Sequence, residues 1–159
     1  MVPSVLYFIC LLAATTAQVL ELNEGKVQGF EYKTKKGDIA EVFLNIPFAL
    51  PPIGELRFER PQPPKPWADV RNGTIFGAAC IQIVPEAAFT RSLEISEDCL
   101  SLNIIRPKTK GSRNFLPILF YVHGSAYEMF SAVECGYKGF AEMFADREVI
   151  VVTIQHRLG

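Results

Sequence analysis

A serine close to two histidines is the first arrangement in this chain of 159 residues that could do chemistry. Ser125 lies two positions after His123, and His156 follows a later apolar run. A serine hydroxyl becomes a useful nucleophile when an imidazole takes its proton and a carboxylate orients that imidazole. No Asp or Glu is placed to orient either ring, and small residues at the end of a strand usually serve a turn. We therefore interpret His156 as a packing or capping residue and expect no catalytic pair here.

The sequence gives no support for metal, cofactor or nucleic-acid chemistry. Its two histidines and four cysteines form no Cys-x-x-Cys or His-x-x-x-His pair, so no metal site is expected. Its glycines form no phosphate-binding loop, so no cofactor is expected. A formal net charge of -1 gives no field that would attract nucleic acid. Two small basic clusters are interpreted as solvated loops: Lys33, Lys35 and Lys36, and Lys108, Lys110 and Arg113.

The first 17 residues predict a secretory signal peptide. Residues 5–14 are an unbroken apolar run, well short of the ~20 residues needed to cross a bilayer. Thr15 and Ala17 suit a signal-peptidase site, which would leave Gln18 as the mature N-terminus. Because no Lys or Arg precedes the run, a buried N-terminal strand or helix stays open as the alternative. We thus expect a signal peptide at 1–17 and one secreted domain at 18–159, with no membrane span in this segment.

Secretion determines how the cysteines are interpreted. Cys10 leaves with the signal peptide, so Cys80, Cys99 and Cys135 remain in an oxidising compartment. Cys80 and Cys99 are the better pair because they enclose a short loop, whose closure contributes about 3 kcal/mol in the chain-entropy model. Asn72-Gly73-Thr74 is a glycosylation sequon in a predicted turn, which agrees with the secretory route.

Short apolar runs predict a β meander followed by the first strands of an α/β sheet. Strands are expected at 26–30, 40–44, 100–105, 116–122 and 149–154, and a short amphipathic helix at 139–146. The last two strand runs are almost continuously apolar, which is typical of strands buried on both faces. A sheet begun so late cannot bury both faces with so little chain left, so we expect a truncated fold of poor solubility.

Seven prolines between positions 47 and 66 exclude regular structure from that stretch. Large apolar side chains are spread along it, which predicts a coil held against the surface rather than a free linker. The expected anchors are Phe48, Leu56, Phe58 and Trp67.

Three sets of residues resemble the type B carboxylesterase and cholinesterase family. These are NIPFALPPIGELRFERPQPPKPW at 45–67, SEDCLSLNIIRP at 96–107, and the pair LPILFYVHG at 116–124 and VIVVTIQHRLG at 149–159. The resemblance implies the N-terminal part of an α/β-hydrolase fold. It also implies a disulfide between Cys80 and Cys99 and an ion pair between Arg57 and Glu97.

The resemblance further implies ester hydrolysis by a Ser, Asp or Glu, and His triad, with the Ser in a G-x-S-x-G elbow. No G-x-S-x-G occurs in the sequence, so no catalytic residue is expected here and the triad is expected beyond Gly159. The family's oxyanion segment reads HGGG, which makes Gly124, Ser125 and Ala126 the candidate donors. Every non-proline residue keeps its N–H, but Ser125 resists positive φ, so we expect a distorted hole. A plain turn after a strand stays open as the alternative.

These observations favour the N-terminal fragment of a secreted carboxylic ester hydrolase, inactive alone, whose full-length form takes a small carboxylic ester. The alternative is a non-catalytic, cholinesterase-like adhesion or ligand-binding protein in which the oxyanion loop has drifted. Choline-selective relatives carry a Trp inside the first disulfide loop, where it holds a quaternary ammonium. Here residues 81–98 contain Phe89 as their only aromatic residue. A general carboxylesterase is therefore favoured over a cholinesterase.

Overall fold

The computed structural model describes residues 18–83, 93–108 and 115–158. The predicted signal peptide at 1–17, the aromatic Phe89 and two basic residues of the second cluster, Lys110 and Arg113, lie outside the described residues.

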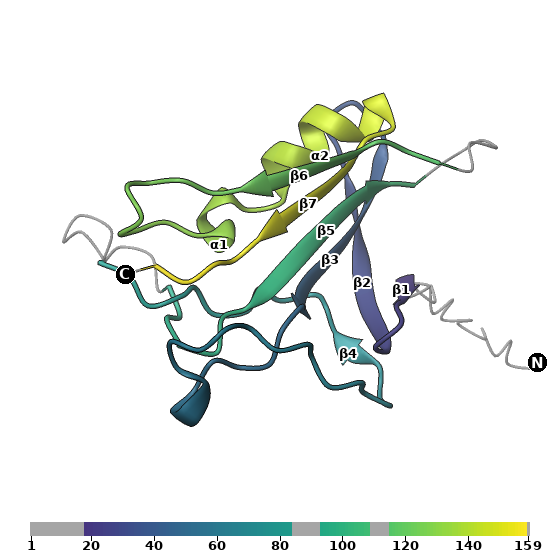
Figure 1. Ribbon diagram of the computed structural model, residues 1–159. Coiled ribbons are helices and arrows are strands. Elements are labelled where there is room, and N and C mark those ends of the chain that lie inside the picture. The colour runs from purple at the N-terminus through teal and green to yellow at the C-terminus, as the bar shows by residue number, and fades with distance from the viewer. Residues whose placement is uncertain (1–17, 84–92, 109–114, 159) are drawn as a thin grey trace, which may run out of the picture.

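One mixed sheet organises the chain, in the order β1-β2-β3-β5-β7-β6, with β4 paired to β2 (Figure 1). Its strands are β1 (Gln18–Glu21), β2 (Lys26–Lys33), β3 (Ile39–Pro47), β4 (Arg71–Asn72), β5 (Ser101–Pro107), β6 (Ile118–Val122) and β7 (Ile150–Ile154). The helices are α1 (Ala132–Cys135) and α2 (Lys138–Phe144), with 3-10 turns η1 (Gly54–Leu56) and η3 (Ala145–Arg147).

The sheet changes from antiparallel to parallel pairing along its width. Strands β1, β2 and β3 form a meander, and β5 pairs antiparallel with both β3 and β7. Strand β6 pairs parallel with β7, with Phe120 opposite Val152. Parallel neighbours need a crossover, which α1 and α2 supply. The segments that follow β6 and β7 therefore meet at the same edge of the sheet.

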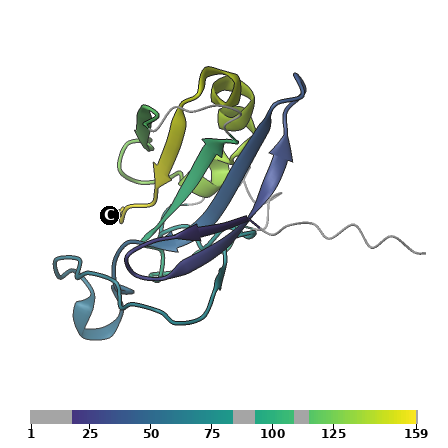
Figure 2. The ribbon, with the colours of Figure 1, turned by 90° about the vertical axis from the view of Figure 1, so that its right-hand side faces the viewer.

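The main core lies between the sheet and α2 (Figures 1 and 2). Fully buried strand residues such as Val42 and Val151 face Ala141 of the helix. Alternation along each strand places these residues on the same side of the sheet. A rim of partly buried aromatic residues closes this core: Phe30, Tyr32, Phe76, Tyr137, Phe140 and Phe144.

Strand β6 contradicts the prediction that it is buried on both faces. Ile118 is 63% exposed, Phe120 57% and Val122 53%. Among the described strands β7 is its sole neighbour, and these three side chains lie on the sheet face opposite α2. An apolar run indicates that a strand can be buried, but it does not indicate which neighbouring elements cover the strand. The exposed apolar strand at the edge of the described sheet is thus β6.

The proline-rich segment departs from its prediction in two ways. Pro47 ends β3, and residues 54–56 form the 3-10 turn η1, so regular structure is not wholly excluded. Phe58 is 86% exposed and anchors nothing in the core. Trp67 does pack against the second face of the sheet, and its indole Nε1 donates to the Lys26 carbonyl at 2.9 Å.

The strand and helix predictions hold within a few residues. Strand β2 runs on to Lys33, and the expected helix at 139–146 divides into α2 and η3. The short elements β1, β4 and α1 were not predicted, because two to four residues give too little periodicity to detect.

The exposed face of β6 leads to a prediction about solubility. Replacing Phe120 with Lys should reduce aggregation of the chain, because it places a charge on the exposed apolar face of an edge strand. The free energy of unfolding should change by no more than about 0.5 kcal/mol, as expected at a surface position. Light scattering at equal concentrations measures the effect, with Ile75→Lys, also exposed but outside the strands, as the control. Equal aggregation of the Phe120→Lys and unchanged chains would contradict it.

Candidate active-site region

The two histidines meet at the edge of the sheet where β6 and β7 both end. His123 directly follows β6, and His156 lies two residues after β7. Their rings stack with centroids 4.1 Å apart and planes 14° from parallel. Nε2 of His156 also lies 3.1 Å from the carbonyl oxygen of His123. The contact supports the packing role that the sequence predicted for His156.

His123 is buried at the start of the loop that follows β6. It is 3% exposed, and its Nδ1 lies 3.3 Å from the carbonyl oxygen of Gly124. Burial, which disfavours the charged ring, lowers the pKa of His123, and the neighbouring His156 adds to this. Its Nε2 is buried without a hydrogen-bond partner in the described part of the chain. The imidazole is thus almost wholly buried within the described part of the chain.

The hypothetical serine–histidine pair does not form. Ser125 is exposed, and no hydrogen bond joins its hydroxyl to an imidazole within the described residues. Its carbonyl oxygen instead accepts from the amides of Glu128 and Met129, at 3.3 and 3.4 Å. Ser125 therefore takes part in the turn, as small residues at strand ends usually do.

The loop after β6 has a backbone conformation that favours glycine. φ is 107° at Ser125, 56° at Ala126 and 62° at Tyr127. Gly124 is outside this range, and a Cβ added to it would meet nothing within 4 Å. Left-handed backbone costs an L residue roughly 1–2 kcal/mol. The two candidate donors that replace family glycines thus adopt positive φ in spite of their side chains.

This loop forms one wall of a cavity of about 630 Å³. All three candidate oxyanion donors border the cavity, as do both histidines. Its full lining is Val122, His123, Gly124, Ser125, Ala126, Tyr127, His156, Arg157 and Leu158. Such a volume is within the range of small-molecule sites.

Two polar residues that the sequence did not single out fix the end of the loop. Ser131, fully buried, caps α1 by accepting from the Glu134 amide at 3.2 Å. Gln155, 1% exposed, accepts from the Ala132 amide at 3.0 Å and donates to the Ala78 carbonyl at 3.2 Å. A lone polar residue after a β-branched run carries no periodic signal, although its place between a strand and His156 could have indicated a buried connector.

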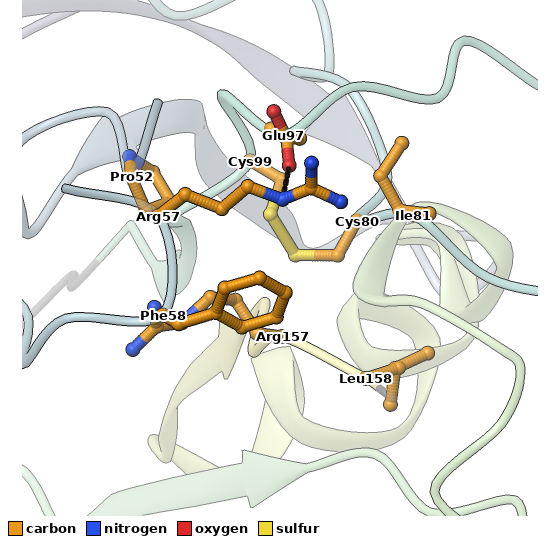
Figure 3. Close-up of a pocket in the computed structure, with 9 residues that line it drawn as sticks. All are labelled: Pro52, Arg57, Phe58, Cys80, Ile81, Glu97, Cys99, Arg157 and Leu158. Carbon is orange, nitrogen blue, oxygen red and sulfur yellow. Dashed lines mark ion pairs between the residues drawn. A yellow bond between two sulfur atoms is a disulfide. The ribbon is translucent and has the colours of Figure 1, made fainter. Parts of the chain in front are cut away.

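The disulfide between Cys80 and Cys99 is confirmed. Beside it, Nε of Arg57 lies 2.6 Å from Oε1 of Glu97, with the side chains 58% and 34% exposed. Figure 3 shows these groups together at a second cavity, of about 420 Å³. At such exposure the ion pair contributes at most about 1 kcal/mol.

The remaining predicted positions lie outside both cavities. Cys135 is a free, half-buried thiol, and burial raises its pKa, which keeps it protonated and poorly nucleophilic. Asn72 is exposed at the end of β4 rather than in the predicted turn, and its Oδ1 accepts from the amide and hydroxyl of Thr74 at 2.9 and 2.7 Å. No group of three or more metal-ligating side chains occurs in the described ranges. No helix among the described residues is long and apolar enough to span a membrane.

A parallel strand pair with a helical crossover, a loop of positive φ at its carboxyl end and a preceding meander agree with the N-terminal part of an α/β-hydrolase. Comparison with known proteins identifies the family. The model of the carboxylesterase family matches residues 16–159, and the chain belongs to that family.

Individual relatives agree with this assignment. Gut esterase 1 of Caenorhabditis briggsae is 48% identical over 92% of this chain and 25% of its own length. Para-nitrobenzyl esterase of Bacillus subtilis is 38% identical over 91% of this chain and 28% of its own. A solved PNB esterase superimposes with a TM-score of 0.78 at 36% identity, covering 91% of this chain and 28% of that one. The chain thus spans about a quarter of the length of these relatives.

Glycine substitutions test whether the loop is strained. Ser125→Gly should raise the free energy of unfolding by up to about 1 kcal/mol, because relief of the left-handed strain exceeds the entropy that glycine adds to the unfolded chain. Gly124→Ala is the control, because that position has neither positive φ nor a close neighbour, and it should be tolerated. Denaturant unfolding measures both. A Ser125→Gly variant less stable than the unchanged chain would show that the loop does not hold this conformation.

Proposed function

We propose that this chain is the N-terminal part of a secreted carboxylic ester hydrolase and supplies its oxyanion-binding loop. The observation that carries the proposal is the run of positive φ at Ser125, Ala126 and Tyr127 beside the 630 Å³ cavity. Strained backbone of this kind persists where the surroundings hold it, and it gathers at functional sites. Membership of the carboxylesterase family supports an ester as the substrate.

In this proposal the amides of residues 124–126 stabilise the charge that develops during acyl transfer. Attack on an ester carbonyl turns its oxygen into an oxyanion, and fixed N–H donors bind that charge more strongly than the neutral carbonyl. One such donor is worth roughly 10²–10³ in kcat. The nucleophile, the acid and the catalytic histidine come from outside these residues, since the sequence contains no G-x-S-x-G.

The two substituted glycines also suggest a second candidate function. A cholinesterase-like adhesion or ligand-binding protein would keep the fold while its oxyanion loop drifted. The retained positive φ at Ser125 and Ala126 favours the enzyme, because a loop without a function has no need to hold strain. Transcript sequence past the codon of Gly159 separates the two candidates. An elbow serine followed by an acid and a histidine supports the enzyme, and loss of that serine supports adhesion.

Ester hydrolysis tests the proposed division of the active site. The 159-residue chain should not hydrolyse p-nitrophenyl butyrate above background, because the nucleophile and its partners are absent. A hybrid in which residues 18–158 replace the matching quarter of Bacillus subtilis para-nitrobenzyl esterase should hydrolyse it. The hybrid without its nucleophilic serine is the control. Organophosphate-sensitive activity of the chain alone would refute the first expectation, and a cooperatively folded but inactive hybrid would refute the oxyanion role.

Secretion should leave a glycan on Asn72. Expressed in eukaryotic cells, the chain should appear in the medium or the secretory pathway with a mass that N-glycosidase lowers, because the side chain of Asn72 is exposed at the end of β4. Asn72→Gln should abolish the mass change, while Thr74→Ser keeps the sequon and should preserve it. A chain that stays in the cytosol, or a mass change that survives Asn72→Gln, would contradict the proposed route.

A further inference from the structure

We infer that Gln82 is a positioning residue for the loop after β6, which it holds in its strained conformation from the disulfide-closed segment. The oxyanion-binding role of the loop rests on the proposed function. The claim that Gln82 holds the loop rests on the contacts alone.

The strained loop needs support from outside itself. Positive φ occurs at Phe130 (83°) as well as at Ser125, Ala126 and Tyr127. The hydrogen bonds within the loop lead to a single acceptor, the Ser125 carbonyl, and they are long at 3.3 and 3.4 Å. Strained backbone relaxes unless the surrounding structure restrains it. The restraint must therefore come from neighbouring segments.

Residues 82 and 83 provide that restraint through two adjacent hydrogen bonds. The side-chain Oε1 of Gln82 accepts from the amide of Phe130 at 2.6 Å. The amide of Ile83 donates to the carbonyl of Glu128 at 2.9 Å. Together they fix the distal half of the loop, on the side away from β6.

The attachment point of Gln82 is itself rigid. Gln82 lies two residues after Cys80, which is buried and bonded to Cys99. The segment at Ala79 also pairs with Ile95, and Ser96 donates to the Ala79 carbonyl at 2.9 Å. A restraint anchored this way transmits little motion to the loop.

The side-chain amide of Gln82 uses only its oxygen for hydrogen bonding in the described structure. Nε2 of Gln82 is buried with no partner among the described residues. Burying an unpaired donor opposes folding. Within the described structure, the Gln82 side chain therefore makes one hydrogen bond, the one that it accepts from the Phe130 amide. Gln155, by contrast, pairs both ends of its amide and holds Ala132, beyond the strained residues.

Three variants separate this role from general stabilisation. Gln82→Met keeps the length of the side chain and removes the acceptor. Gln82→Glu keeps an acceptor for the Phe130 amide. Gln18→Met makes the same chemical change on β1, where the side chain donates to Glu31, and serves as the matched control.

Hydrogen exchange of the 159-residue chain reads the restraint directly. In Gln82→Met the Phe130 amide should exchange roughly three- to tenfold faster, which is what loss of one net hydrogen bond predicts. The Ala132 amide, bound to Gln155, and the Trp67 amide, bound to the Glu24 carbonyl, should not change. Gln82→Glu should restore slow exchange at Phe130, and Gln18→Met should leave it unaltered.

Steady-state kinetics of the hybrid esterase measure the effect of loop position on catalysis. Gln82→Met should lower kcat about tenfold with little change in KM, since misplaced donors weaken binding of the transition state more than that of the ester. Gln82→Glu should recover most of kcat.

The outcomes distinguish the two proposals. Unchanged exchange at Phe130 in Gln82→Met, or faster exchange with Gln82→Glu as well, overturns the positioning role. Gln82→Met could instead lose protection throughout the chain, and the test then moves to the unchanged chain. If its Phe130 amide exchanges as fast as exposed loop amides, the positioning role is overturned. A hybrid that never hydrolyses esters, combined with the expected exchange pattern, removes the oxyanion function and leaves the positioning role standing.

Discussion

The structure depends on a loop that must hold positive φ at residues with side chains. Ser125 and Ala126 stand where the family resemblance implies glycine, and both adopt positive φ, a conformation that favours glycine. Such a path is stable when every neighbouring element restrains it. His123 is buried at its start, Gln82 and Ile83 bind its distal half, and the Ser131 cap and Gln155 fix its end. The conformation of this loop is thus a product of the packing around it.

The parallel pairing of β6 and β7 explains why these restraints converge. Because both strands end at the same edge, the loop after β6 lies against the residues after β7, and His156 stacks on His123. Nε2 of His156 also lies 3.1 Å from the His123 carbonyl oxygen, so His156 contacts both the ring and the backbone of His123. His156 therefore helps to enclose the start of the loop.

The sequence could predict only those features that leave a local pattern of residues. Apolar runs located β5 and β7, and the loop length together with the family resemblance located the disulfide. The same apolar signal wrongly predicted a buried β6, because exposure depends on neighbours that the strand does not encode. The prediction that Phe58 anchors the proline-rich segment was wrong for the same reason, since its exposure also depends on neighbours. Gln82 and Gln155 were missed because a single amide bridging distant segments has neither period nor motif.

The drift from HGGG to His123-Gly124-Ser125-Ala126 is weaker evidence of lost function than it first appears. Glycine in a left-handed position avoids steric strain but leaves the unfolded chain more freedom, which costs roughly 0.5–1 kcal/mol per residue on folding. Serine or alanine there bears strain of roughly 1–2 kcal/mol but restricts the unfolded chain. The net difference is about 1 kcal/mol per position, comparable to a single hydrogen bond. A loop restrained by Gln82, Ile83 and Gln155 can absorb it, so its backbone can keep the same path with a side chain at both positions.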